Sequence, residues 1–127
     1  MPPFCIIVAE GGIPMNIKYR RTLDVHSAGT QFVLQGFTTG DTNVREVIIG
    51  LRERGNPIYL SASDTASAEI THPDGVTESL EGRIVCGEVA FIIPGTEIEG
   101  IANVRVKVTT DGNTFYCPPF SIEITKI

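Results

Sequence analysis

The sequence predicts an all-β fold, an antiparallel β-sandwich or barrel. Three observations lead to this prediction. Short apolar segments, roughly eight to ten in number, follow one another at near-regular spacing, as in antiparallel sandwiches and barrels. In the clearest segments apolar and polar residues alternate with a period of two, which is the side-chain period of a strand. From Gln31 to Lys126 no stretch has helical periodicity, and the absence of βαβ units argues against a parallel sheet.

The clearest single element is a hairpin near the C-terminus. Residues 104–108 read Val-Arg-Val-Lys-Val, and residues 115–117 read Phe-Tyr-Cys. Asp111-Gly112 lies between them and suits a two-residue type I′ turn, because both central residues of that turn need positive φ. The turn predicts three facing pairs: Val108 with Phe115 and Val106 with Cys117 on an apolar face, and Lys107 with Tyr116 on the other.

Residues 1–30 differ from the rest, and we expect an N-terminal arm or extra strands there, followed by a sandwich domain of residues 31–127. Residues 5–9, Cys-Ile-Ile-Val-Ala, are too few to cross a membrane and follow no basic segment. They predict a first strand rather than a signal peptide. Residues 15–25 mix apolar and basic side chains without clean alternation, and they predict two short strands or extended arms.

The middle of the chain alternates strand-like segments with turn signals. In residues 44–52, one face carries the apolar side chains of Val47, Ile49 and Leu51. Residues 61–64 predict a loop that could begin one helical turn, and residues 72–75, His-Pro-Asp-Gly, predict a turn. The strands expected between residue 31 and the C-terminus are residues 32–37, 44–52, 58–60, 67–71, 76–80, 83–85, 88–93, 104–108, 115–117 and 120–125.

Composition and charge limit the partners. A chain of 127 residues suits one domain that needs no metal or disulfide to hold its core. The formal net charge of −5 argues against nucleic acid or an anionic membrane as the main partner, because phosphate binding requires a basic surface. Cys5, Cys86 and Cys117 show no paired spacing, so we expect reduced thiols, no Cys86–Cys117 bridge and no zinc site.

Histidine and oxygen-ligand patterns give no firm site. Neither His26 nor His72 has Asp, Cys or Ser at a spacing typical of a triad or metal site. Asp41 and Asn43 stand two residues apart, as ligands do in calcium loops, but the full EF-hand pattern is missing. Capping of the turn by Asp41 explains the same residues without a metal.

Glu97 and Glu99 are the remaining candidates for chemistry, because paired carboxylates serve glycoside hydrolysis. They lie in a loop-like stretch between two glycines, in a chain that contains no tryptophan. A solvated acidic loop explains them better. We therefore expect no enzyme activity, no catalytic residue, and no metal or other cofactor.

Several short motifs follow one another in a characteristic order along residues 31–126. They are Asp41-Thr42-Asn43 before an apolar strand, Gly55-Asn56-Pro57 with Leu60, Pro73-Asp74-Gly75, Ala90-Phe91-Ile92-Ile93-Pro94, Asp111-Gly112, and Phe120-Ser121-Ile122-Glu123-Ile124. In their order and spacing they resemble the N-terminal domain of the phage baseplate upper protein family. The resemblance implies an antiparallel immunoglobulin-like β-sandwich in the host-adsorption device of a tailed phage, and it supplies no catalytic residue.

Two functions are weighed on this basis. The first is a structural protein of a phage or prophage tail baseplate, present in the virion after assembly in the bacterial host cytoplasm. It would contact other tail proteins and form a homo-oligomer, with a trimer among the options. The alternative is a carbohydrate-binding module for host-surface glycans, which the lack of tryptophan disfavours. Because tyrosine and arginine are favoured at interface centres, we name six candidate contact residues: Lys18, Tyr19, Arg20, Arg21, Tyr59 and Tyr116.

Overall fold

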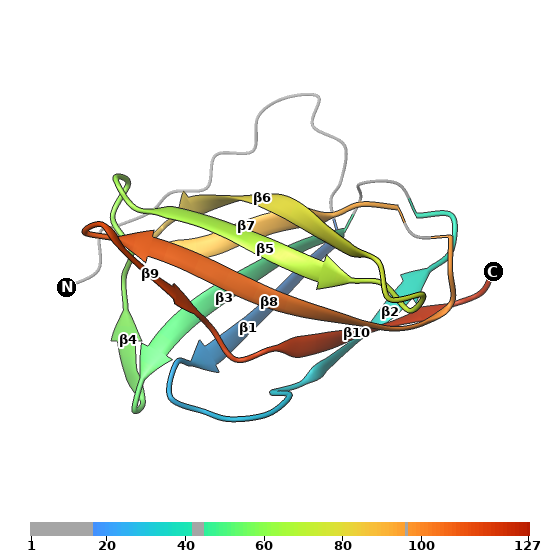
Figure 1. Cartoon of the computed structure of the whole chain (residues 1–127), viewed down its shortest axis with the longest axis horizontal. Coiled ribbons are helices and arrows are strands. Elements are labelled where there is room, and N and C mark those ends of the chain that lie inside the picture. The colour runs from blue at the N-terminus through green and yellow to red at the C-terminus, as the bar shows by residue number, and fades with distance from the viewer. Residues whose placement is uncertain (1–16, 42–44, 96) are drawn as a thin grey trace.

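The structure, a computed structural model, describes residues 17–41, 45–95 and 97–127. Within these ranges it contains ten strands and no helix, which confirms the all-β prediction (Figure 1). The predicted strand of residues 5–9 lies outside the described residues. None of the described segments forms a helix long and apolar enough to cross a membrane. The strands are β1 (Ile17–Asp24), β2 (Val33–Thr38), β3 (Arg45–Glu53), β4 (Asn56–Ile58), β5 (Thr65–Thr71), β6 (Thr77–Val85), β7 (Glu88–Ile93), β8 (Gly100–Thr110), β9 (Asn113–Tyr116) and β10 (Phe120–Thr125).

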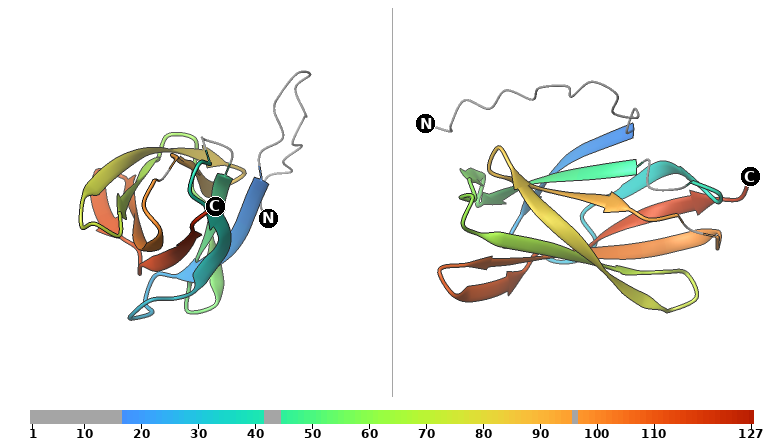
Figure 2. Two further views of the ribbon diagram at one scale, coloured as in Figure 1. Left: turned by 90° about the vertical axis from the view of Figure 1, so that its right-hand side faces the viewer. Right: turned by 90° about the horizontal axis from the view of Figure 1, so that it is seen from above.

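The strands form one continuous, strongly curved sheet that nearly closes into a barrel (Figure 2). Their order is β1-β3-β7-β6-β5-β8-β10-β2, with β4 also paired to β3 and β9 to β8. Strand β6 belongs to both sides of the sheet, because residues 77–81 pair with β5 and residues 82–85 pair with β7. We call β1, β3, β7 and residues 82–85 half-sheet A. Residues 77–81, β5, β8, β10 and β2 form half-sheet B.

The prediction of a wholly antiparallel sheet is wrong at both ends of this order. Strand β1 pairs with β3 in parallel along all eight of its residues, and β2 pairs with β10 in parallel. The other pairs are antiparallel. The alternation of side chains is the same in both kinds of pairing, so the sequence pattern does not reveal strand direction. The sheet of the described residues is therefore mixed.

Three hairpins are closed by the same two-residue turn. Both central residues have positive φ in Arg54-Gly55, Cys86-Gly87 and Asp111-Gly112, as a type I′ turn requires. The predicted register of the last hairpin is confirmed, since Val108 pairs with Phe115 and Lys107 with Tyr116.

The predicted segments 76–80 and 83–85 are one strand, β6, which bends where it passes between the half-sheets. Gly82 lies at this point. A Cβ atom there would stand 2.7 Å from the carbonyl oxygen of Ala66, so only glycine allows the close approach. The bend lets one strand serve both sides of the core, as at the corners of other curved sheets.

Alternate residues of both half-sheets point inward and fill a single core. Val47, Ile49 and Leu51 of β3 are fully buried, as the alternation predicts. Phe120 of β10 is completely inaccessible and lies among aromatic rings. Its ring centroid is 4.8 Å from that of Phe32 and 6.4 Å from that of Phe91, which comes from half-sheet A.

Strand β1 enters the sheet as one element. Residues 15–25 were expected to give two short strands or arms, and the described part of this segment is the single strand β1. Its Leu23 is buried in the core opposite Leu51. The division of the chain at residue 30 stays a prediction.

The cysteines differ from one another. Cys117 is a free, buried thiol, and burial raises its pKa to about 12, so it is an inert core residue. Cys86, in the turn between β6 and β7, is disulfide-bonded, so the expectation of a reduced thiol is wrong there. Cys5 lies outside the described residues. A bridge between Cys86 and Cys117 is absent, as expected.

Candidate contact surface

The outward side of half-sheet A brings the side chains of several charged residues together, and we call it the β1 face. The parallel register of β1 and β3 places Lys18 beside Glu46 and Arg20 beside Ile48. The antiparallel register of β3 and β7 extends these rows of outward side chains onto β7. The β1 face consists of Lys18, Arg20, Thr22, Glu46, Ile48, Gly50, Arg83, Glu88, Ala90 and Ile92.

Ion pairs connect the strands across the β1 face. The carboxylate of Glu46 is 4% exposed and lies between two cations. Lys18 Nζ is 3.8 Å from one of its oxygens, and the guanidinium of Arg83 donates a hydrogen bond to the other. A second pair joins Arg20 and Glu88 at 3.3 Å. Lys18 and Arg20, two of the predicted contact residues, thus lie on this surface, and carboxylates hold their side chains in place.

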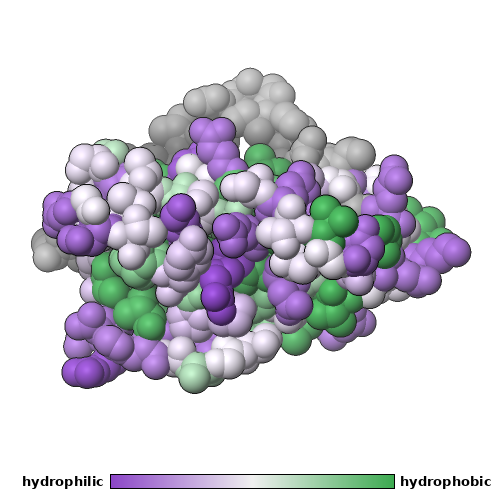
Figure 3. Space-filling model, viewed as in Figure 1, coloured by the Kyte–Doolittle hydropathy of each residue, from purple (hydrophilic) through white to green (hydrophobic). Residues whose placement is uncertain are grey.

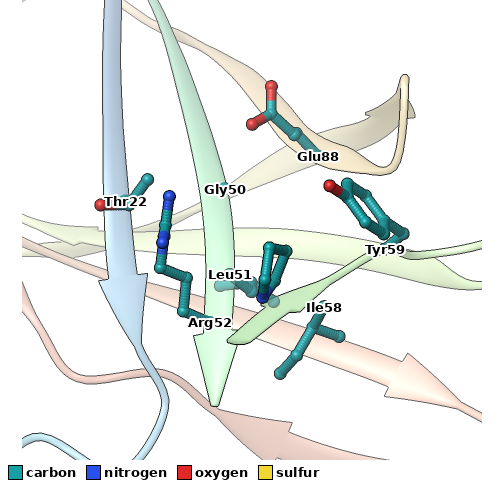
Figure 4. Close-up of a pocket in the computed structure, with 8 residues that line it drawn as sticks. Thr22, Gly50, Leu51, Arg52, Ile58, Tyr59 and Glu88 are labelled. Atoms are coloured by element: carbon teal, nitrogen blue, oxygen red, sulfur yellow. The ribbon is translucent and has the colours of Figure 1, made fainter. Parts of the chain in front are cut away.

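Tyr59 lies at the end of the β1 face, just beyond β4. Its side chain is half exposed and borders a hollow of about 100 Å³ with Arg52, Gly50 and Glu88 (Figure 4). The backbone N–H of Leu60 donates to the carbonyl of Gly87 at 3.0 Å, which anchors this stretch to the turn between β6 and β7. Three predicted contact residues, Lys18, Arg20 and Tyr59, therefore share one side of the molecule.

Tyr19 is placed elsewhere, at the seam between the two ends of the sheet. Its ring stacks on that of Phe37 of β2, with centroids 4.7 Å apart. Its hydroxyl accepts a hydrogen bond of 3.0 Å from Arg45, and the guanidinium of Arg45 also bonds Asp41. Side chains, rather than a backbone ladder, thus link β1 to β2 among the described residues. This packing makes Tyr19 a structural residue of the seam.

Asp41 gives the seam a predicted pH dependence. Burial alone would raise the pKa of its carboxyl group, but hydrogen bonds from the Thr38 backbone and the Arg45 guanidinium outweigh burial and lower the pKa below 3.8. The stabilisation of the folded state by the ionised Asp41 carboxylate is therefore complete above pH 3.8, and it is lost as the pH falls through the depressed pKa. Asp41→Asn should cost about 1–2 kcal/mol at neutral pH.

The Asp41→Asn prediction is checked by urea unfolding as a function of pH. The difference in unfolding free energy between wild type and variant should shrink as the pH falls below 3.8. Asp74→Asn is the control, since Asp74 is exposed and its carboxylate accepts a local hydrogen bond from the Val76 backbone. A difference that stays constant over the whole pH range would contradict the role of the Asp41 charge.

Arg21 and Tyr116 also lie off the β1 face. Arg21 takes an inward register position beside Ile49 but is exposed. Tyr116 lies on the outward side of half-sheet B, where its ring is 5.9 Å from Lys107 Nζ. Figure 3, drawn from the side of β5 and β8, shows a largely hydrophilic to neutral surface across this half-sheet with separate hydrophobic patches.

The residues considered for chemistry do not converge. His72 bonds Glu78 at 3.0 Å, and His26 lies 3.6 Å from Glu53 in a different part of the molecule. Asp41 is engaged by Arg45, and Asn43 lies outside the described residues. Among the residues that the structure describes, no group of three or more His, Cys, Asp or Glu side chains could hold a metal ion.

Three charged residues of the β1 face were not identified as site residues from the sequence: Glu46, Arg83 and Glu88. Glu46 carried a signal, because it is a carboxylate directly before the apolar residues 47–49 of β3. A buried carboxylate requires a cationic partner, so a search for that partner was warranted. Nothing in the sequence pattern pointed to Arg83, which is 37 residues away along the chain.

Comparisons with known proteins bear on the fold. No family model and no curated protein matches the chain. Among solved structures, the fold is similar to that of the N-terminal domain of phage TP901-1 ORF48, with a TM-score of 0.63 and 13% sequence identity. The similarity covers 86% of this chain and 98% of that chain. At this level of identity the similarity extends to the fold alone.

Proposed function

We propose that this protein is a non-enzymatic structural module of a phage or prophage tail baseplate, assembled in the host cytoplasm and carried in the virion. The observation that supports the proposal most is the fold shared with almost the whole N-terminal domain of phage TP901-1 ORF48. The order of motifs in residues 31–126 resembles the phage baseplate upper protein family and favours the same role. The immunoglobulin-like assignment is part of this proposal.

The proposed mechanism is docking through a sheet face rather than through strand addition. Both ends of the sheet carry features that discourage a further strand. Arg21 places a charge at an inward position of β1, and β2 has a bulge beside Gly36 where its register to β10 shifts. Inward charges and bulges protect sheet edges from pairing with other chains. The outward faces are therefore the better contact surfaces.

The β1 face is the proposed docking surface for a neighbouring tail protein or a second copy of this chain. Lys18, Arg20 and Arg83 are exposed there, and Ile92 is exposed at its margin, whereas Ile48 and Ala90 between them are buried. Arginine beside apolar and aromatic groups is typical of interface centres. A homo-oligomer, with a trimer among the options, follows if copies dock through this face.

Light scattering over a range of protein concentrations tests the proposal. The average mass should rise with concentration, or on addition of purified tail baseplate. Arg20→Ala should weaken the association by about tenfold, because it removes an exposed interface cation.

Lys107→Ala is the matched control, since Lys107 is a cation on half-sheet B. Both substitutions should leave thermal stability within about 1 kcal/mol of wild type. A mass that stays monomeric at every concentration, and is unaltered by baseplate, would refute the proposal.

A further inference from the structure

The hollow beside Tyr59 is formed at a point where β3 has no side chain. Gly50 occupies an outward position, between Thr22 on β1 and Glu88 on β7. Arg52, two residues further along β3, lies beside it, and Tyr59 forms the opposite wall (Figure 4). Gly50 itself is buried, and a depression of about 100 Å³ lies beside it.

The polar groups around Gly50 converge on this depression. One carboxylate oxygen of Glu88 pairs with Arg20 at 3.3 Å, and the other stands 2.6 Å from the place that a Cβ atom on Gly50 would take. Arg52 donates to the Gly55 carbonyl at 3.3 Å and is one of the residues that line the hollow. One acidic and one basic residue therefore line one small space.

The aromatic wall is fixed before any ligand arrives. A Cβ atom on Gly87 would come within 3.1 Å of the Tyr59 ring and 3.4 Å of its Cα, so the ring packs closely on this turn. The turn has positive φ at Gly87 and is bonded to the Leu60 N–H. Tyr59 nevertheless stays 50% exposed, which leaves much of its surface free for a ligand.

The balance of charge selects the class of ligand. The hollow is lined by one carboxylate, Glu88, and one guanidinium, Arg52, so its formal charge is zero. An anion would meet Glu88, and a cation would meet Arg52. A neutral ligand with neighbouring hydroxyl groups can form hydrogen bonds with both side chains, because a hydroxyl donates to a carboxylate and accepts from a guanidinium. We propose that this hollow binds one neutral saccharide unit, with Tyr59 against the ring.

Saturation-transfer NMR of the full chain tests this proposal. The probes are the methyl glycosides of glucose, galactose, rhamnose and N-acetylglucosamine, with inorganic phosphate and arginine amide as charged comparisons. At least one glycoside should show transfer from the protein. Tyr59→Ala and Glu88→Gln should each weaken that binding by about tenfold. Gly50→Ala should do the same, because its Cβ atom would stand 2.6 Å from a carboxylate oxygen of Glu88 and displace that side chain.

Tyr116→Ala is the matched control, because Tyr116 is 49% exposed but lies on half-sheet B. It should leave saccharide binding unchanged, and circular dichroism should confirm that every variant is folded. The inference is overturned if no glycoside binds, if only phosphate or arginine amide binds, or if Tyr116→Ala weakens binding as much as Tyr59→Ala. Because association is measured without sugars, either proposal can fail without the other.

Discussion

Replacing Phe120 with alanine should destabilise the protein by about 3–5 kcal/mol. Phe120 is fully buried, and its ring meets Phe32 near one end of half-sheet B and Phe91 of half-sheet A. Removing it deletes apolar burial and leaves a cavity between the two half-sheets, which the surrounding strands fill only in part. Such a loss is a large share of the stability of a domain of this size. Urea unfolding followed by circular dichroism measures it.

The control for Phe120→Ala is Tyr116→Ala, which removes an aromatic ring of similar size from the surface. Tyr116 is half exposed, so its loss should cost well under half as much. The two variants should also differ in cooperativity. If one core joins both half-sheets, Phe120→Ala will lower the midpoint of a single transition. Separate unfolding of half-sheets A and B would contradict a shared core.

The sequence contained the information for the antiparallel hairpins but not for the closure of the sheet. The turn at Asp111-Gly112 sets the register of its hairpin locally, through two positive φ values and the alternation of apolar and polar residues on either side. The same logic applies to Arg54-Gly55 and Cys86-Gly87, where the glycine was the signal. By contrast, the parallel partners of β1 and β2 are distant in sequence, and no short-range pattern encodes them.

The candidate surface was predictable in its chemistry more than in its geometry. Exposed cations and tyrosines were found from the sequence, but alternation alone does not show which strands are neighbours. Lys18 and Arg20 share a face because β1 lies beside β3, whereas Tyr19, between them, turns to the seam. Tyr59 joins that face only because the turn at Gly87 holds it there. Contacts with residues that are distant in the sequence therefore determine where each of these side chains lies.

Arg83→Ala should cost about 2 kcal/mol, because it leaves the carboxylate of Glu46 without its hydrogen-bonding cation. Glu46 is almost fully buried, so water cannot replace that bond, and Lys18 remains 3.8 Å away. Arg83 itself is 61% exposed, which keeps the cost below that of breaking a fully buried pair. Urea unfolding of the single variants and of Glu46→Gln/Arg83→Ala measures the coupling between the two residues.

The double variant decides the cause of the loss. If the cost arises from an unpaired buried charge, Glu46→Gln/Arg83→Ala should be more stable than the sum of the two single losses predicts. Arg20→Ala is the matched control, since it breaks a pair in which the carboxylate, that of Glu88, is 26% exposed, and it should cost less than about 1 kcal/mol. Equal losses for Arg20→Ala and Arg83→Ala would mean that burial of Glu46 adds nothing. Both ion pairs of the β1 face would then contribute as little as ordinary surface ion pairs, and the stability of the sheet would depend on its apolar core.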